Sequence, residues 1–172
     1  VPWAYEAIST LADRGIINGR SDELFEPNDT VTREEFVKIC VNICGLDSSD
    51  KTVVFSDEVS GEWYTGYLKA AYDSGLVRGR DDGTFGIGEP VSRQDMAVIL
   101  YNIIKAHIDS VKEPQNKFDD ADVISEYAKD AVSCLSELGI INGTGDNLFS
   151  PLDTATRAEA AKMAFGILEY VK

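Results

Sequence analysis

The sequence predicts an all-α protein built from three copies of one helix-loop-helix unit. One set of residues recurs three times, and 18 positions separate the same two members each time: Gly15 and Arg33, Gly75 and Arg93, Gly139 and Arg157. Each copy carries two apolar patterns of helical period, and the length differences fall in polar connectors between the copies. A helical pair of this size cannot bury its apolar face alone. We therefore expect the copies, residues 1–46, 53–107 and 116–172, to form one body about a pseudo-threefold axis.

Charge and composition exclude several classes of partner. The 30 acidic residues outnumber the 16 basic ones, and the formal net charge is −14. Such a field repels nucleic acid and anionic membranes, so we expect neither as a partner. No apolar run approaches the length of about 18 residues that a membrane span needs. Because the chain begins at Val1, we expect a processed product or a piece cut from a longer protein.

The first helix of each copy begins with an aromatic residue. In the first copy Trp3, Ala7 and Leu11 follow the spacing of one helix face. The corresponding aromatic residues in the other copies are Trp63 and Tyr127. Each pattern stops at a glycine that suits the left-handed position after a helix end. These glycines are Gly15, Gly75 and Gly139.

A loop and a second helix follow. The loop contains one phenylalanine, which we expect to anchor it in the core, and a second glycine, which marks a turn or a close backbone approach. The second helix begins at a hydroxyl residue with an acid three positions later, the pattern of a capping box. These pairs are Thr32 and Glu35, Ser92 and Asp95, Thr156 and Glu159. A short lead-in motif precedes only the second and third copies, as Phe55-Ser56-Asp57 and Phe118-Asp119-Asp120.

An arginine directly follows each of these N-caps, as Arg33, Arg93 or Arg157. The helix macrodipole is positive at this end, which costs an exposed cation about 0.3–1 kcal/mol. One interpretation is that the arginine and the free N–H groups of the helix start receive an anion, because the guanidinium fork suits a carboxylate or phosphate. The other is that the arginine pairs with the acid three positions into the helix or with a loop carboxylate.

Aromatic residues and glycines complete the candidate site. Trp3 and Trp63 are natural platforms for a sugar ring, although an aromatic residue at the head of an amphipathic helix also fits simple core packing. The second loop glycines belong to the site because the backbone can approach a ligand closely there. They are Gly19, Gly79 and Gly143. The residues together predict three similar sites for an anionic group, carried on a polymer.

Catalytic and metal chemistry have little support in the sequence. The single histidine, His107, lies in a connector and leaves no Ser-His or Cys-His pair. Cys40 and Cys44 share a helix face at a spacing that can hold a metal, but their counterparts in the other copies are apolar core residues. The segment from Arg80 to Gly83 lacks the alternating oxygen ligands of a calcium loop. We expect no metal, no cofactor and no enzymatic activity.

The ordered motifs resemble the S-layer homology domain, here in three copies that cover nearly all of the chain. The first copy carries the match in Gly15-Ile16-Ile17-Asn18-Gly19, Phe25-Glu26-Pro27 and Thr32-Arg33-Glu34-Glu35. The third copy carries it from Gly139 to Gly143, in Phe149-Ser150-Pro151 and in Thr156-Arg157-Ala158-Glu159. The resemblance implies a three-pronged spindle of helical units. It also implies non-covalent anchoring of a secreted protein to the cell envelope of a Gram-positive bacterium.

The resemblance further implies a ligand. The usual one in that family is a secondary cell-wall polysaccharide bearing pyruvylated N-acetylmannosamine, held in grooves between prongs and met by the three arginines. The second copy has Gly86-Ile87 where the others have a residue followed by proline, so we expect Arg33 and Arg157 to contribute most to binding and Arg93 least. The alternative function is a protein scaffold that assembles surface arrays, in which the arginines dock acidic partner segments.

Overall fold

The computed structural model describes residues 1–21, 24–108 and 117–171. Over these ranges the chain forms six α-helices, three short 3-10 turns and isolated β-bridges but no β-sheet, which confirms the predicted all-α class. The helices are α1 (Tyr5–Asp13), α2 (Arg33–Cys44), α3 (Thr65–Asp73), α4 (Arg93–Ile104), α5 (Lys129–Glu137) and α6 (Arg157–Gly166). The 3-10 turns cover Pro2–Ala4, Glu126–Ala128 and Leu168–Tyr170. None of the helices in these ranges is long and apolar enough to span a membrane.

A closed ring of backbone hydrogen bonds joins the three repeats at the centre of the molecule. The N–H of Val31 donates to the carbonyl of Ala155 (3.1 Å), that of Ala155 to Val91 (3.1 Å), and that of Val91 to Val31 (3.0 Å). These residues occupy the same position in their repeats, directly before the N-cap of the second helix, and all three are buried. Each repeat therefore makes the same bond to a neighbour, which gives the body its pseudo-threefold axis.

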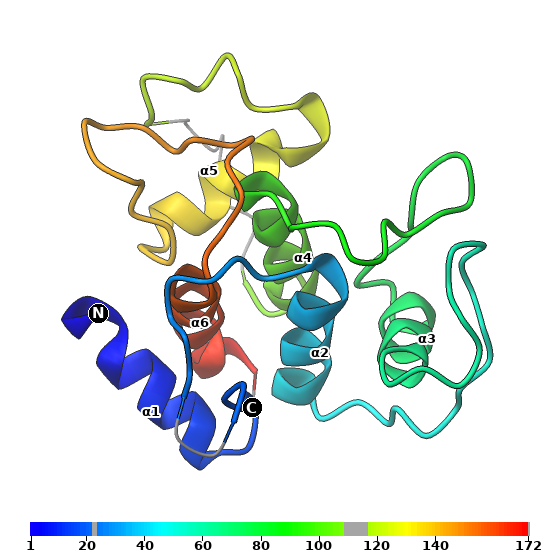
Figure 1. Cartoon of the computed structure of the whole chain (residues 1–172). Coiled ribbons are helices and arrows are strands. Elements are labelled where there is room, and N and C mark those ends of the chain that lie inside the picture. The colour runs from blue at the N-terminus through cyan, green and yellow to red at the C-terminus, as the bar shows by residue number, and fades with distance from the viewer. Residues whose placement is uncertain (22–23, 109–116, 172) are drawn as a thin grey trace.

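Helices pack between repeats rather than within them. The first helix of each repeat lies against the second helix of the preceding one, so α3 packs on α2, α5 on α4 and α1 on α6. The second helices α2, α4 and α6 lie towards the middle of the molecule, with α1, α3 and α5 outside them (Figure 1). Because α1 and α6 are the first and last helices of the chain, their contact closes the ring of repeats.

The predicted helix ends are present in all three repeats. Each first helix is followed by a glycine in the left-handed region, where a side chain would be strained. The φ angles of Gly15, Gly75 and Gly139 are +68°, +74° and +73°. The chain then turns back, because the next backbone N–H reaches a carbonyl in the last turn of the helix, as from Ile16 to Leu11 (2.9 Å).

The second helices begin at the predicted caps. The side chains of Thr32, Ser92 and Thr156 each accept the backbone N–H of the residue three positions later. The full capping box, with the acid also accepting the N–H of the cap residue, forms in α2 and α6. In α4 the carboxylate of Asp95 binds two other side chains instead, which are described with the site below.

The leading aromatic residues do not lie on the buried faces of the first helices. Trp3 and Tyr127 lie in 3-10 turns and Trp63 lies in a turn, each directly before its α-helix. Ala7 and Leu11 are buried as predicted, whereas the three aromatic residues are exposed. The prediction that Trp3 shares their helix face is therefore wrong, because the α-helix begins only after it.

The lead-in motifs hold the loops of repeats 2 and 3. The carboxylate of Asp57 accepts the backbone N–H groups of Phe85 (2.7 Å), Gly86 (2.7 Å) and Ile87 (2.9 Å). The carboxylate of Asp120 does the same in repeat 3, where it accepts the N–H groups of Phe149 and Ser150. The loop phenylalanines are completely buried beside the lead-in phenylalanines, which confirms their role as anchors in these two repeats.

Parts of the chain lie outside the described residues. They are residues 22–23 of the first loop, residues 109–116 of the second connector, and residue 172. The division into repeats at 1–46, 53–107 and 116–172 stays a prediction, and the two end residues of the third unit belong to these parts.

Candidate ligand-binding site

Three grooves lie beside the glycine loops, and each is lined by all three repeats. We name each groove after the repeat that supplies its loop and its second helix. The repeat-1 groove is lined by Asn18, Arg20, Glu35, Lys38, Trp63 and Arg157. The repeat-2 groove is lined by Arg33, Arg78, Arg80, Asp95, Val98 and Tyr127. The repeat-3 groove is lined by Trp3, Arg93, Asn142, Thr144, Glu159 and Lys162.

The same construction rule applies to every groove. The repeat before it supplies the arginine, and the repeat after it supplies the aromatic residue. The volumes are about 280 Å³ for repeat 1, 650 Å³ for repeat 2 and 390 Å³ for repeat 3. Small-molecule sites commonly measure about 300–1,000 Å³, so the repeat-2 and repeat-3 grooves fall within that range and the repeat-1 groove lies just below it.

Each arginine reaches across to the loop of the next repeat. The Nε of Arg33 donates to the carbonyl of Phe85 (2.9 Å), and the Nε of Arg93 donates to that of Phe149 (2.8 Å). The Nε of Arg157 closes the ring by donating to the carbonyl of Phe25 (2.9 Å). The expectation that an arginine acts with the loop of its own repeat is therefore wrong, because the side chain leaves its helix towards the neighbouring repeat.

Most of the N–H groups at the helix starts are not free to receive an anion. The backbone N–H groups of Arg33, Arg93 and Arg157 donate to carbonyls of neighbouring repeats at 2.9, 3.0 and 2.8 Å. The next N–H is also taken in α4 and α6, and the one after that is bound by the cap side chain in all three helices. This part of the anion-site interpretation is wrong for α4 and α6, and in α2 only the N–H of the buried Glu34 has no partner among these bonds, so the groups that remain to bind an anion are mainly side chains.

Two of the arginines form the ion pair that the other interpretation predicts, but across repeats. The Nη1 of Arg33 lies 2.6 Å from a carboxylate oxygen of Asp95, and that of Arg93 lies 2.7 Å from Glu159. Burial lowers the pKa of Arg93, and the nearby carboxylate of Glu159 opposes that shift. A guanidinium nevertheless stays protonated in proteins, so both pairs are charged.

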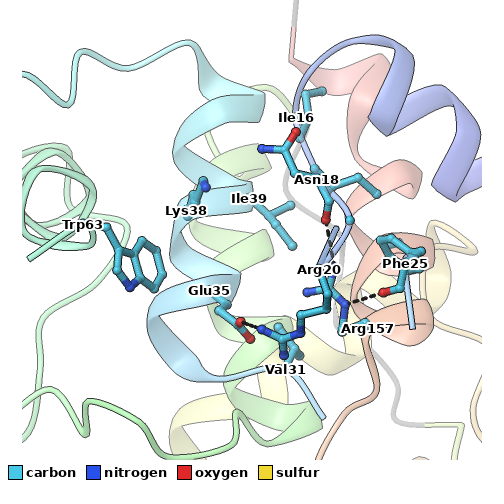
Figure 2. A pocket seen from close by; sticks show the side chains of 13 residues that line it. Ile16, Asn18, Arg20, Phe25, Val31, Glu35, Lys38, Ile39, Trp63 and Arg157 are labelled. Atoms are coloured by element: carbon cyan, nitrogen blue, oxygen red, sulfur yellow. Dashed lines mark hydrogen bonds and ion pairs between the residues drawn. The ribbon is translucent and has the colours of Figure 1, made fainter. Parts of the chain in front are cut away.

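The two tryptophans stand at the groove edges rather than in the core. Trp3 is 53% exposed and Trp63 is 46% exposed, so the core-packing interpretation of these residues is wrong. The Lys38 ammonium lies 5.5 Å from the centre of the Trp63 ring, within the range of a cation–π contact. Figure 2 shows Trp63 and Lys38 on one side of the repeat-1 groove, with Arg20 and Arg157 on the other. An aromatic platform and cations thus line one space.

The aromatic residue of the repeat-2 groove is held differently. The hydroxyl of Tyr127 donates to Asp95 (2.7 Å) and accepts from the side-chain amide of Gln94 (3.0 Å). Burial of this hydroxyl and its bond to Asp95 raise the pKa of Tyr127 to about 12. Asp95 therefore binds Arg33 with one oxygen and Tyr127 with the other, so both oxygens of its carboxylate have partners within the protein.

The three loop glycines line the grooves as predicted by their position. A side chain at Gly19 would place its Cβ 2.4 Å from the carbonyl oxygen of Ser21, closer than two such atoms can approach. Gly79 and Gly143 adopt φ angles of +76° and +74°, which disfavour any other residue. Only glycine therefore preserves this turn beside each groove.

Sequence reasoning missed several groove residues. Lys38 and Lys162 occupy the same position in their repeats, five residues after the arginine, where repeat 2 has Val98. Each lysine lies three residues after the capping acid, Glu35 or Glu159, and this spacing places an acid and a cation on one face of the helix. The sequence therefore contained a signal for these two lysines.

The cysteines lie apart from the grooves. All three are free, with Cys40 and Cys134 buried and Cys44 half-buried. Burial, and then the proximity of Cys44, raise the pKa of Cys40, so its thiol stays protonated at neutral pH. The described part of the chain contains no group of three side chains that could hold a metal ion.

Comparison with known proteins gives a consistent family match. The model of the S-layer homology domain matches residues 1–37, 54–97 and 117–161. The chain is 35% identical over 170 residues to an amylopullulanase of Thermoanaerobacterium thermosulfurigenes, covering 97% of this chain and 9% of that protein. It is 36% identical over 170 residues to exoglucanase XynX of Acetivibrio thermocellus, covering 97% of this chain and 16% of that enzyme. It is 32% identical over 161 residues to the S-layer protein sap of Bacillus anthracis, covering 93% of this chain and 19% of that protein. The chain thus spans less than a fifth of the length of these relatives.

Proposed function

Because the chain belongs to the S-layer homology family, we propose that its grooves bind an anionic cell-wall polysaccharide. Family membership and relatives that are S-layer proteins support anchoring at the cell surface. The polysaccharide, its pyruvylated N-acetylmannosamine and a Gram-positive host are the finer proposal. In this proposal the chain binds without catalysing a reaction, and any catalytic activity belongs to other parts of a protein that carries it.

The observation that carries the proposal is the pairing of an exposed aromatic ring with cations in one groove. The whole chain has a net charge of −14, yet Arg20, Lys38 and Arg157 line the repeat-1 groove together with Trp63. A guanidinium binds a carboxylate through short, charge-assisted hydrogen bonds. The indole face offers an apolar surface to a sugar ring. A sugar that carries a carboxylate combines both demands in one ligand.

The scaffold alternative uses the same cations for acidic protein segments. It gives no role to the half-exposed tryptophans beside them, whereas a saccharide ligand does. The two functions also differ in their response to removal of the wall polysaccharide. Removal should abolish binding by a saccharide-binding module but not the docking of acidic protein segments.

The test is a pull-down with purified cell-wall sacculi before and after chemical removal of the pyruvylated polysaccharide. We expect the protein to sediment with intact sacculi and to stay in solution once the polysaccharide is removed. The double variant Lys38→Val with Arg157→Ala should sediment less, whereas Lys51→Ala, in an exposed connector, should behave like the parent. Sedimentation that survives removal of the polysaccharide would favour the scaffold or another wall component.

A further inference from the structure

The three grooves differ in where the acid near the start of the second helix finds its partner. In the repeat-2 and repeat-3 grooves this acid binds the arginine that enters from the preceding repeat. In the repeat-1 groove the corresponding acid, Glu35, lies 2.6 Å from the Nη1 of Arg20 instead. Arg20 belongs to the same repeat as Glu35, so the entering arginine is displaced from its usual partner.

The displaced residue is Arg157. Its guanidinium donates to the backbone carbonyls of Phe25 and Asn18, both at 2.9 Å, and to no carboxylate among the residues that the structure describes. Figure 2 shows the two guanidinium groups close together, Arg20 turned to Glu35 and Arg157 turned to the loop. Carbonyl groups orient a guanidinium but leave its net charge in place. Burial, and next the charge of Arg20, lower the pKa of Arg157, while the nearby carboxylates of Glu35, Asp29 and Glu26 oppose that shift.

In neither of the other grooves does a second arginine replace the entering arginine as the partner of the acid. The residue equivalent to Arg20 is Arg80 in repeat 2, and its guanidinium forms a two-bond pair with Glu89 of its own loop. In repeat 3 the equivalent residue is Thr144, which has no charge. Asp95 and Glu159 therefore stay with the entering arginines, and those two guanidinium groups are neutralised.

The charges of the groove linings also set the repeat-1 groove apart. In the repeat-1 groove three cations, Arg20, Lys38 and Arg157, face one carboxylate. In the repeat-3 groove two cations, Arg93 and Lys162, face one carboxylate. In the repeat-2 groove three arginines face Asp81 and Asp95, with Glu89 as a third carboxylate bound to Arg80. The repeat-1 groove therefore has the largest positive excess in an acidic protein.

We propose that the repeat-1 groove is the principal site for the anionic ligand, and that Arg20 is a positioning residue that draws Glu35 away from Arg157. This inference rests on the proposed function and ranks the grooves within it. The uncommitted guanidinium of Arg157 then receives the sugar carboxylate, with Lys38 beside the aromatic platform. The ligand class is a saccharide with a single carboxylate, as in a pyruvyl acetal.

The chain offers a separate reporter for this groove. Its two tryptophans stand in different grooves, Trp63 in that of repeat 1 and Trp3 in that of repeat 3. In Trp3→Phe the fluorescence comes from Trp63 alone, and in Trp63→Phe from Trp3 alone. Titration with the methyl glycoside of pyruvylated N-acetylmannosamine then measures the repeat-1 and repeat-3 grooves separately. We expect tighter binding at Trp63 than at Trp3.

The decisive variant is Arg20→Thr in the Trp3→Phe background, which copies the threonine of repeat 3. We expect Glu35 to turn to Arg157 and the affinity at Trp63 to fall about tenfold, since a charge-assisted contact to the ligand is lost. Adding Glu35→Gln should restore the affinity, because a neutral amide cannot neutralise the charge of the guanidinium and glutamine still fits a capping box. Adding Asp13→Asn, at an exposed position that does not line the groove, changes the net charge equally and should restore nothing.

Each outcome bears on one statement. Unchanged affinity in Arg20→Thr overturns the inference, as does a loss that Glu35→Gln fails to rescue, which would make Arg20 a direct ligand contact. Equal affinity at the two tryptophans overturns the ranking of the grooves. If the glycoside changes neither fluorescence, the proposed ligand itself is wrong and the inference falls with it. Circular dichroism spectra and melting temperatures show whether every variant is folded.

Discussion

Arg93 shows how much a single groove arginine contributes to the fold. It is 5% exposed, and its guanidinium joins the carbonyl of Phe149 to the carboxylate of Glu159 in the next repeat. The helix macrodipole alone would make the removal of a cation from a helix start neutral or slightly stabilising. The structure overturns that expectation, because removal would leave a buried carbonyl and a carboxylate without their partner.

We therefore predict that Arg93→Ala lowers the free energy of unfolding by about 1.5–3 kcal/mol, because it removes charge-assisted hydrogen bonds to a buried carbonyl and a half-buried carboxylate. Urea denaturation followed by circular dichroism measures the loss. The exposed Arg78 provides the control, since Arg78→Ala should change the free energy by less than about 0.5 kcal/mol. A stability equal to that of the parent in Arg93→Ala would show that the inter-repeat ion pair adds nothing to the fold.

Binding should follow a different order from the one that the sequence predicted. Arg33 serves the repeat-2 groove, which lacks the lysine and has Asp95 bound to both Arg33 and Tyr127. We expect Arg33→Ala to have the smallest effect on affinity and Arg157→Ala the largest, a loss of roughly 1.5–3 kcal/mol. Calorimetric titration with the pyruvylated glycoside gives the order. Arg157→Lys is the matched control, because it keeps the charge but loses the planar fork.

Asp57 gives a prediction for acid stability. Burial raises its pKa, but the N–H groups of Phe85, Ile87 and Gly86 together outweigh burial and lower the pKa below its usual value. The folded protein thus favours the charged carboxylate. Its contribution to stability is present above the unfolded pKa of about 3.9 and is lost as the pH falls through the lower, folded pKa.

Accordingly, Asp57→Asn should lower the free energy of unfolding at pH 7 by about 1–3 kcal/mol. The difference from the parent should shrink as the pH falls below about 4. Denaturation curves at a series of pH values test this. Asp13→Asn, at an exposed position, should show no such dependence, and a gap that stays constant with pH would mean that the carboxylate charge plays no part.

At the level of helices, the ends could be predicted from local chemistry and the packing could not. The left-handed glycines and the hydroxyl caps depend on neighbours within a few residues, so short motifs such as Thr32 to Glu35 determine them. The partner of each helix depends on which repeat lies beside it. The spacings inside a repeat are the same whether its first helix packs on its own second helix or on that of a neighbouring repeat. Nothing in them therefore showed that α3 packs on α2.

The cap of α2 provides a prediction at this level. Thr32→Ala removes the oxygen that accepts the N–H of Glu35 and should cost about 1 kcal/mol of stability. Thr32→Ser keeps that oxygen and should cost less. Thermal unfolding of both variants makes the comparison. If alanine and serine are equally tolerated, the capping hydrogen bond does not determine the stability of this helix start.

For the molecule as a whole, a groove does not correspond to one repeat of the sequence, because residues of all three repeats line it. The threefold spacing predicted three sites, and the structure has three grooves in which an arginine, an aromatic residue and a loop glycine recur. It could not show that a groove takes its arginine from one neighbour and its aromatic residue from the other, as Arg157 and Trp63 do in the repeat-1 groove. A single excised repeat would therefore lack both of these residues. It would also lack the helices of the neighbouring repeats that pack against its own two helices.

This shared construction predicts that the three repeats unfold together. The ring through Val31, Val91 and Ala155 and the contact of α1 with α6 make every repeat depend on both others. Urea unfolding should therefore show one transition. In Trp3→Phe, the midpoint from Trp63 fluorescence should equal the midpoint from circular dichroism of the same variant. In Trp63→Phe, the midpoint from Trp3 fluorescence should likewise equal that from circular dichroism. Two separated midpoints within one variant would show that a repeat can leave the ring while the others stay folded, and binding by grooves shared between repeats would then be lost before the protein unfolds.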